Sequence, residues 1–454
     1  MEHSLATMLP LYSVTPFVGM LLSIALGPVL APHFWERHFG KIALAWAMVI
    51  ALPMLIAYRE LAVHELLHIL LVDYIPFIIL LAALFTVGGG ILVRTTLKGT
   101  TLVNAAFLTI GSLLASWMGT TGTAMLLIRP FLRVNKHRKY RAFMVVFFIF
   151  MIANIGGALT PLGDPPLFLG FLHGVPFFWT LHLFGPQLIA LVALLLLYLA
   201  FDYYYLQKEQ KENENVALAT PDHKNDKKIE ILGSANFLLL AAIIGIILFS
   251  GNVQMNTVSV LGVSIAIQDI IRNALLCVII LLSWLITPQC LRKENEYSWD
   301  PILEVGYLFF GIFVTMAPVL AILKAGEAGA LGFITSAVNK PADYFWVTGL
   351  LSSFLDNAPT YLTFLSTSLG QFYPGVAEPL AISCLIAENP QYLMAVSTGA
   401  IFFGAVTYIG NAPNFMVRSI AEKSGVRMPS FFGYMVYSIS ILFPLFGLIT
   451  FLYY

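Results

Sequence analysis

Long apolar runs follow one another along this chain, and short polar stretches separate them. Runs of roughly 17 to 25 apolar residues match the ~30 Å hydrocarbon core of a membrane. Two apolar stretches, 99–128 and 343–370, are interrupted midway by helix-breaking residues, and we expect re-entrant hairpins there. We expect about ten transmembrane helices, at 12–30, 42–58, 66–92, 140–172, 176–204, 234–250, 270–288, 301–323, 391–417 and 431–453.

The two halves of the chain share a pattern of helix-breaking residues. Residues 157–166, Gly-Ala-Leu-Thr-Pro-Leu-Gly-Asp-Pro-Pro, return as residues 404–413, Gly-Ala-Val-Thr-Tyr-Ile-Gly-Asn-Ala-Pro. The hairpin tips correspond too, since residues 115–123 align with residues 352–360. Paired interruptions of spanning helices are typical of the substrate site of a secondary transporter. The alternative is close helix packing by small residues, which does not require Pro and Asp at matching places.

A long polar segment divides the chain and gives its expected organisation. We expect a first inverted repeat at 1–204, a cytoplasmic linker at 205–232 and a second repeat at 233–454, each repeat with five spans and a hairpin. The basic residues support this topology, because an external N-terminus places nearly all of the 24 Lys and Arg residues in cytoplasmic loops. The exceptions are Arg59, Arg272, Lys324 and Lys340. Both termini are therefore expected outside the cell.

Composition agrees with an all-α multi-pass membrane protein. The chain is 59% hydrophobic and 11% charged, with a mean hydropathy of +0.85 and a formal net charge of zero. This balance excludes a strongly basic nucleic-acid binder. The three cysteines show no metal or disulfide spacing, and no nucleotide-binding loop occurs, so coupling to an ion gradient is expected. We expect the protein in the cell membrane, specifically a bacterial inner membrane.

The interruptions hold the polar residues that could bind an ion or a small substrate. Hydroxyl, amide and carboxylate oxygens beside unwound carbonyls are the hard ligands that a small cation prefers. The candidate ligands are Ser116, Thr120, Thr121, Thr123, Asn154, Thr160 and Asp164 in the first half, and Ser353, Asp356, Asn357, Thr360, Thr407 and Asn411 in the second. The glycines expected to break the helices are Gly157, Gly163, Gly404 and Gly410.

Asp164 and Asp356 are the strongest of these candidates. A carboxylate at membrane depth is energetically costly and is functional by default, so we place a Na⁺ hypothesis on both. Burial favours the protonated acid, which could exchange its proton for Na⁺. The alternative is that each Asp caps a half-helix N-terminus, particularly Asp164, because Gly-Asp-Pro-Pro resembles a helix start. Capping and ion binding can also coexist.

One further motif points to a different class of protein. His64-Glu65-Leu-Leu-His68 fits the pattern in which two histidines one helical turn apart bind Zn²⁺ and the glutamate activates water. No third ligand stands out at a fitting depth, and these residues are ordinary at an interfacial helix start. An intramembrane zinc protease is therefore a remote alternative, and we do not expect an enzyme. Asp73 and Glu304, near span ends, are expected to be solvated or paired.

The order of spans, hairpin and broken helix, repeated in inverted form, resembles the ion transporter superfamily. With Leu355-Asp-Asn-Ala-Pro-Thr360 and Gly156-Gly-Ala-Leu-Thr-Pro-Leu-Gly-Asp164, the chain is most similar to D-type sodium/proton antiporters and to citrate-transporter-like and arsenite-permease-like proteins. The resemblance covers nearly the whole chain except the linker. It implies a homodimer whose hairpins and broken helices move as an elevator against a scaffold. It also implies an ion site at Thr120 to Thr123, Gly163 to Asp164, Asp356 to Asn357 and Gly410 to Asn411.

This chain departs from both closest patterns. The antiporters follow Gly-Asp with threonines, where this chain has Pro165-Pro166-Leu167-Phe168. Sodium-coupled dicarboxylate relatives carry Ser-Asn-Thr at both tips, where this chain has only Asn357 and Thr360 at one.

The pair of acidic residues, Asp164 and Asp356, with no basic residue in any break, favours a Na⁺/H⁺ antiporter. A Na⁺-coupled citrate or dicarboxylate symporter and an arsenite-type anion permease are the alternatives. No cofactor is expected beyond Na⁺ and H⁺, and the expected partners are membrane lipid, a small ion or carboxylate and a second copy of the chain.

Overall fold

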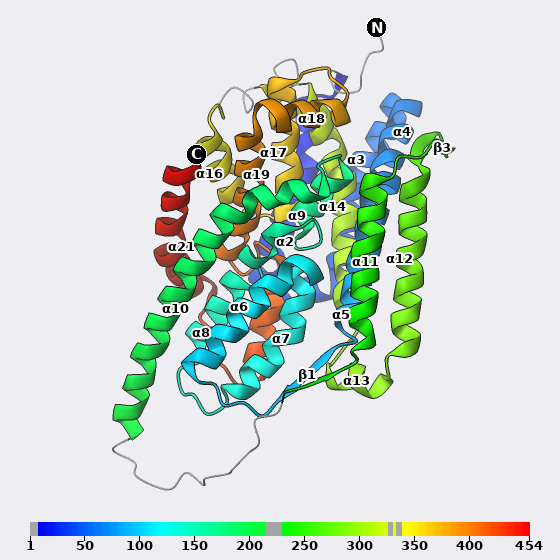
Figure 1. Cartoon of the computed structure of the whole chain (residues 1–454). Helices are drawn as coiled ribbons and strands as arrows, with labels where there is room; N and C mark the ends of the chain where they lie inside the picture. Colours follow the sequence, from blue (N-terminus) through cyan, green and yellow to red (C-terminus); the bar gives the residue numbers. More distant parts are fainter. Residues whose placement is uncertain (1–7, 214–228, 326–329, 333–337) are drawn as a thin grey trace.

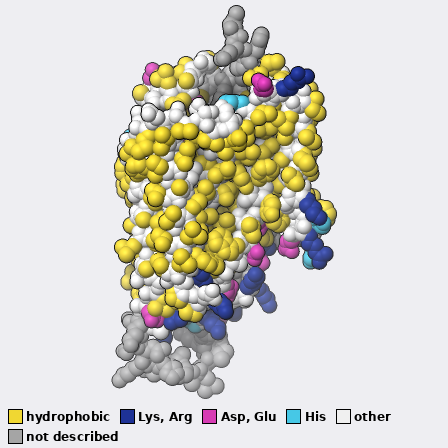
Figure 2. Space-filling view, turned by 90° about the vertical axis from the view of Figure 1, so that its right-hand side faces the viewer, with side chains coloured by type: hydrophobic (Ala, Val, Ile, Leu, Met, Phe, Trp, Pro, Cys, Tyr) yellow, Lys and Arg dark blue, Asp and Glu magenta, His cyan; other side chains and the backbone are white. Residues whose placement is uncertain are grey.

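The fold is built almost entirely from helices, and many of them are long enough to cross a membrane. The computed structural model describes residues 8–213, 229–325, 330–332 and 338–454. In these residues, ten helices have the length and apolar composition of membrane spans. The expected all-α polytopic architecture is therefore confirmed (Figure 1). The ten differ from the predicted set at two places: they include Thr101–Met118, predicted as part of a hairpin, and leave out the predicted span 391–417, where the apolar helix Pro390–Val406 is shorter. Figure 2 shows a broad apolar band on one face, with most of the visible Lys and Arg side chains below it.

The structure describes the first half of the chain without a gap from Met8 to the end of helix α10. It holds the 3₁₀-helices η1, η3 and η4 and the π-helix η2. Its elements in order are η1 (Leu11–Val14), α2 (Thr15–Leu30), α3 (Pro32–Tyr58), α4 (Glu60–His68), η2 (Ile69–Tyr74), α5 (Ile75–Gly88), β1 (Leu92–Thr95), α6 (Thr101–Met118), α7 (Thr120–Val134), α8 (Ala142–Met151), η3 (Ile155–Leu159), α9 (Pro165–Leu172), η4 (Phe177–Leu183) and α10 (Phe184–Asn213).

The second half begins with a strand that pairs back to the first half. Strand β1 lies antiparallel to β2, and β3 pairs with β4. The elements in order are β2 (Ile229–Leu232), α11 (Ala235–Asn252), β3 (Thr257–Val260), β4 (Val263–Ala266), α12 (Ile267–Ile286), α13 (Gln289–Glu294), α14 (Asp300–Lys324), α16 (Pro341–Ser352), α17 (Asn357–Phe372), α18 (Glu378–Glu388), α19 (Pro390–Phe403), η6 (Gly404–Val406), α20 (Ala412–Lys423) and α21 (Phe431–Tyr453).

Helices α6 and α7 form the first re-entrant hairpin. Gly119 turns the chain between them with φ of +81°, a conformation that favours glycine. The two ends of the hairpin meet, since the Gly99 N–H donates to the Val134 carbonyl at 2.9 Å. Asn104 and Asn135 exchange amide hydrogen bonds of 2.9 and 2.7 Å beside that point. The chain therefore enters and leaves on one side, as expected, although α7 continues six residues beyond the predicted end at 128.

Helices α16 and α17 form the second hairpin, and its ends also meet. The Tyr344 hydroxyl, near the start of α16, donates to Oε1 of Gln371 at the end of α17 over 2.6 Å. Figure 1 shows the first hairpin in the lower half of the molecule and the second in the upper half. The two hairpins therefore enter from opposite ends, which is the arrangement that an inverted repeat requires.

The two broken helices lie in the interior between these hairpins. In the most apolar stretch of Ala142–Leu159, 89% of the residues are buried, compared with 22% in the peripheral helix α12. Unwound backbone at membrane depth is tolerated only where protein or water satisfies it, so this burial is a physical requirement. Helices α11 and α12 lie along one edge of Figure 1, and α10 and α21 lie along the other.

The predicted linker begins later than the sequence indicates. Helix α10 continues through Glu209, which accepts hydrogen bonds from the Arg138 side chain at 2.7 Å and from the Tyr140 N–H at 2.9 Å. Arg138 also pairs with Asp202 at 2.9 Å. These carboxylates hold the end of α10 against the basic loop before α8, so residues 205–213 stay helical. Residues 214–228 of the predicted linker lie outside the described residues.

Candidate functional site

The first helix break is tied to the tip of the first hairpin. The chain leaves α-helical geometry after Met151, passes through the 3₁₀-helix η3 and resumes the α-helix at Pro165. The Ser116 hydroxyl donates to the Gly156 carbonyl at 2.6 Å and accepts from the Leu159 N–H at 3.1 Å. The Thr160 hydroxyl donates in turn to the Ser116 carbonyl. Hydroxyl groups thus replace part of the hydrogen bonding that the interrupted helix loses.

The second break repeats these contacts at the places that the sequence repeat indicates. The Thr407 hydroxyl donates to the Ser353 carbonyl, as Thr160 does to Ser116. The Ile409 N–H donates to Thr407 Oγ1 at 3.2 Å, which matches the bond from Leu162 to Thr160. Two equivalent hydroxyl bonds at equivalent breaks give the sequence repeat a structural counterpart.

The four predicted helix-break glycines stand where the backbone folds tightly on itself. A Cβ atom added at Gly163 would lie 2.1 Å from the Gly157 carbonyl oxygen, which is far inside van der Waals contact. A Cβ atom at Gly410 would lie 2.8 Å from the Gly404 carbonyl oxygen. Both breaks therefore need glycine for close approach of the backbone, and the first is the tighter.

The centre of the site is the carboxylate of Asp164, which is 1% exposed. Its Oδ1 accepts hydrogen bonds from Thr120 Oγ1 at 2.8 Å and from Asn411 Nδ2 at 3.1 Å. Its Oδ2 accepts from Asn357 Nδ2 at 2.6 Å. Thr120 and Asn357 begin the second arms of the two hairpins, and Asn411 follows the second break. One carboxylate therefore joins both hairpin tips and both breaks, and all three of these donors are neutral.

The two aspartates have different roles at their helix ends. Asp164 precedes α9, but its side chain makes no capping bond. Pro165 and Pro166 follow it and have no N–H to offer, so the carboxylate is free to face the cluster. Asp356, by contrast, caps α17 by accepting from the Ala358 N–H at 3.1 Å, and its backbone carbonyl accepts from Thr360 Oγ1 at 2.9 Å. The capping alternative thus holds for Asp356 and not for Asp164.

Three asparagines connect the two breaks. Asn154 Nδ2 donates to Asn414 Oδ1 at 2.7 Å, and Asn411 Nδ2 donates to Asn154 Oδ1 at 3.2 Å. Asn414 Nδ2 also reaches the carbonyls of Gly404 and Thr407 at 2.7 and 2.9 Å. The sequence did not single out Asn414, because the apolar Leu167 occupies the matching place of the first repeat. The signal that could have indicated Asn414 was its position in the first turn of the half-helix α20.

Two buried oxygens near the cluster have no hydrogen-bond partner in the described part of the chain, namely Asn357 Oδ1 and Thr123 Oγ1. A buried acceptor left unpaired is costly, and both oxygens are hard ligands of the kind that a small cation prefers. Ser353 is buried and donates to the Phe403 carbonyl at 3.3 Å. Thr121 is half-buried, and its side chain makes no hydrogen bond within the described ranges. The structure therefore places Thr121 outside the cluster.

The zinc-binding alternative gains no support from the geometry. The rings of His64 and His68 lie 6.4 Å apart, and across the described residues no group of three His, Cys, Asp or Glu side chains could hold a metal.

A separate buried cluster forms elsewhere around His173, which the sequence did not indicate. Its Nε2 lies 3.3 Å from Asp73 Oδ1, and its Nδ1 lies 2.8 Å from Glu378 Oε1. This contact ties the end of α9 to η2 and α18.

Two hairpins and two helix breaks that meet at one buried carboxylate define a membrane transporter of the inverted-repeat class. A family model described as "Putative citrate transport" matches residues 6–454, so the chain belongs to this family of transporters. The chain is also similar to two proteins named as uncharacterized transporters, Mb2703 of Mycobacterium bovis and Rv2684 of Mycobacterium tuberculosis. Each is 25% identical over 342 residues, which cover 72% of this chain and 71% of the relative.

Proposed function

We propose that this transporter is a secondary active Na⁺/H⁺ antiporter that exchanges the two ions at Asp164. The observation that carries the proposal is a buried carboxylate whose partners are Thr120, Asn357 and Asn411, all neutral. An ionised carboxylate in such a place is costly unless a cation balances it. The group is therefore stable in two forms, protonated or bound to a metal cation, and each form excludes the other.

The surrounding oxygens support Na⁺ as the competing cation. Thr120 Oγ1 and the unpaired Asn357 Oδ1 are hard neutral ligands beside the carboxylate. In the exchange, Na⁺ binds to the carboxylate oxygens as the proton leaves to water on the open side. On the other side of the membrane the proton returns and Na⁺ leaves, so one bound charge replaces another at each step.

An elevator motion in a homodimer is the transport mechanism that we propose with it. The hairpins and broken helices contact one another through the Asp164 cluster, so they are suited to move as one body. Helices α2, α3 and α14 pack together outside them, and so do α5, α11 and α12. These two groups would form the scaffold against which the central body moves.

A Na⁺-coupled citrate symporter is the second candidate, and two observations favour it. The family description names citrate transport. In addition, four half-helices, α7, α9, α17 and α20, begin at residues next to the cluster. The positive N-terminal ends of helices attract anions, so a carboxylate substrate has a place to bind without a basic side chain.

Proteoliposomes carrying an internal pH dye separate the two candidates. Wild type and Asp164→Asn would be challenged with Na⁺, Li⁺, K⁺ or citrate. Proton movement on addition of Na⁺ alone, absent in the variant, supports the antiporter. Accumulation of labelled citrate that requires a Na⁺ gradient, with no proton movement by Na⁺ alone, would replace it with the symporter.

A further inference from the structure

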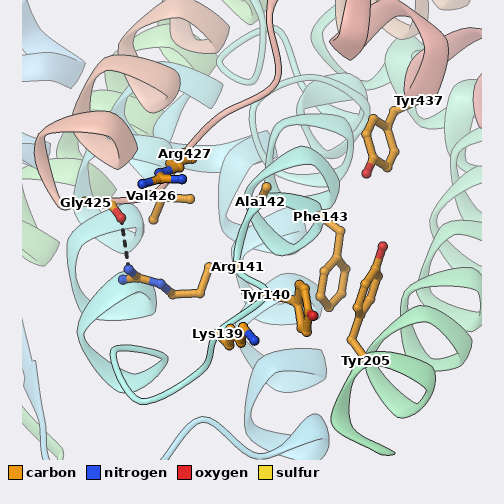
Figure 3. A pocket seen from close by; sticks show the side chains of 10 residues that line it. All are labelled: Lys139, Tyr140, Arg141, Ala142, Phe143, Tyr205, Gly425, Val426, Arg427 and Tyr437. Atoms are coloured by element: carbon orange, nitrogen blue, oxygen red, sulfur yellow. Dashed lines mark hydrogen bonds between the residues drawn. The ribbon is translucent and has the colours of Figure 1, made fainter. Parts of the chain in front are cut away.

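A second polar site lies far from Asp164, at the end of the molecule where the basic loops gather. A cavity of about 420 Å³ opens between the start of α8, the end of α10, the loop after α20 and the start of α21. Three basic residues line it, Lys139, Arg141 and Arg427, and no acidic residue does. Figure 3 shows Arg427 above Arg141 on the side of the cavity that faces the aromatic residues, with the Arg141 guanidinium turned toward the Gly425 carbonyl.

The charge of this cavity is only partly neutralised. Lys139 Nζ pairs with Glu212 at 2.6 Å. Arg141 Nη2 donates to the neutral Gly425 carbonyl at 3.1 Å. In the described ranges, neither Arg141 nor Arg427 makes an ion pair with a carboxylate. Two arginines therefore face one cavity without a counter-charge, and a guanidinium pair suits a phosphate because each can donate two parallel hydrogen bonds.

The remaining walls suit the membrane interface. The Phe143 and Tyr205 rings stack with centroids 4.8 Å apart, and Tyr437 lies above them on the same side of the cavity (Figure 3). Aromatic side chains of this kind gather at the level of lipid headgroups. On α21, Phe432 and Val436 are 75% and 66% exposed, and both precede Tyr437 in the sequence. An apolar surface for acyl chains therefore begins beside a cationic cavity.

We propose that this cavity binds the headgroup of an anionic phospholipid. Arg141 and Arg427 would hold the phosphate, and the acyl chains would lie along Phe432 and Val436. Basic pockets between spans on the cytoplasmic side are suited to such headgroups, and the positive-inside rule assigns this end to the cytoplasm. The cavity lies where the first broken helix begins and the second ends. A bound lipid would thus join the outer ends of both helices that carry the Asp164 cluster.

Native mass spectrometry of the full-length protein in detergent tests this site. Phosphatidylglycerol is the probe, and phosphatidylcholine is the neutral comparison. We expect Arg141→Gln and Arg427→Gln each to weaken phosphatidylglycerol binding about fivefold, as expected for loss of one basic contact to a lipid surface. Arg133→Gln is the matched control, because Arg133 is exposed in the last turn of α7 and lies outside the cavity. It should leave the binding unchanged.

Three results would overturn the proposal. Equal binding of phosphatidylcholine would show that the phosphate charge is not recognised. An equal loss in Arg133→Gln would show general surface attraction. Displacement of phosphatidylglycerol by millimolar inorganic phosphate or citrate would show a site for a soluble anion. None of these readouts depends on transport, so the lipid site and the antiporter proposal can fail separately.

Discussion

The two helix breaks have the same backbone design and differ in the one residue that carries charge. Asp164 in the first break corresponds to Asn411 in the second, and the two side chains hydrogen-bond to each other at 3.1 Å. The hydroxyl of Thr160 and that of Thr407 make the same bond in each break. The repeat therefore supplies a symmetric frame, and the substitution of one carboxylate by an amide leaves a single charge at its centre.

The two aspartates that the sequence ranked together have different environments. Asp164 is 1% exposed and accepts from three side chains, whereas Asp356 is half-buried and caps α17. Both lie at the start of a half-helix. The difference follows from the second residue of each half-helix, because Pro166 has no N–H to donate to a capping side chain and Ala358 has one. The next N–H of the first half-helix, that of Leu167, donates to the Asp164 backbone carbonyl at 3.1 Å.

The largest effect is expected from removing the charge at the first break. Asp164→Asn should reduce ion exchange to the rate of protein-free liposomes, because an amide can neither release a proton nor balance Na⁺. The initial rate of Na⁺-driven proton movement in proteoliposomes measures it. Asp356→Asn is the matched control and should retain most of the activity. Loss of activity only in the Asp356 variant would reverse the assignment.

The next largest effect tests whether the two breaks are interchangeable. We expect the double variant Asp164→Asn with Asn411→Asp to stay inactive. At position 411 the side chain donates to the Ala153 carbonyl and to Asn154 Oδ1, both at 3.2 Å. A carboxylate cannot donate to these acceptors, and leaving a buried acceptor unpaired costs about 1–3 kcal/mol. The single variant Asn411→Asp should therefore lower the free energy of unfolding in detergent. Recovery of transport in the double variant would show that the asymmetry is unimportant.

The glycines of the two breaks should differ in how well they tolerate a methyl group. Gly163→Ala should destabilise the protein by about 1–3 kcal/mol, because the added methyl group meets the Gly157 carbonyl at 2.1 Å. Gly410→Ala should cost less, since its closest contact is 2.8 Å. Gly245→Ala is the control, as no atom lies within 4 Å of its added Cβ. Chemical or thermal unfolding in detergent ranks the three. Equal stability of all three variants would contradict the tight backbone packing.

The smallest effect is expected at the cap of the second hairpin. Asp356→Ala should cost about 1 kcal/mol of stability, while Asp356→Asn should be nearly neutral because Asn caps a helix as well as Asp does. The same unfolding measurement applies to both variants. A loss of Na⁺ binding in Asp356→Asn without loss of stability would instead indicate an ion-binding role for this carboxylate.

The sequence predicted the frame of the molecule well. Apolar runs of membrane length predicted the spanning helices, and glycine and proline inside such runs predicted where both helix breaks lie. The hairpins followed from their polar tips and the placement of Lys and Arg. These features are visible because hydrocarbon penalises polar residues and free backbone so strongly that their positions in the sequence carry information.

The finer features depend on contacts between distant residues. The sequence could not choose between Asp164 and Asp356, since both precede a half-helix, and the role of Asn414 depends on Asn154 in the other half of the chain. The longer α10 depends on Arg138 meeting Glu209. The pairing of β1 with β2 joins residues 92–95 and 229–232, which lie on opposite sides of the polar segment.

Exchange of a proton for Na⁺ at Asp164 is the central proposal, and a measurement of proton release tests it most directly. Purified protein in weakly buffered detergent solution would be titrated with NaCl beside choline chloride, with a pH dye as the readout. We predict that Na⁺ releases protons from wild type and from Asp356→Asn, and releases none from Asp164→Asn. Equal proton release from wild type and Asp164→Asn would show that Asp164 is not the exchange site and that the exchange takes place elsewhere in the protein.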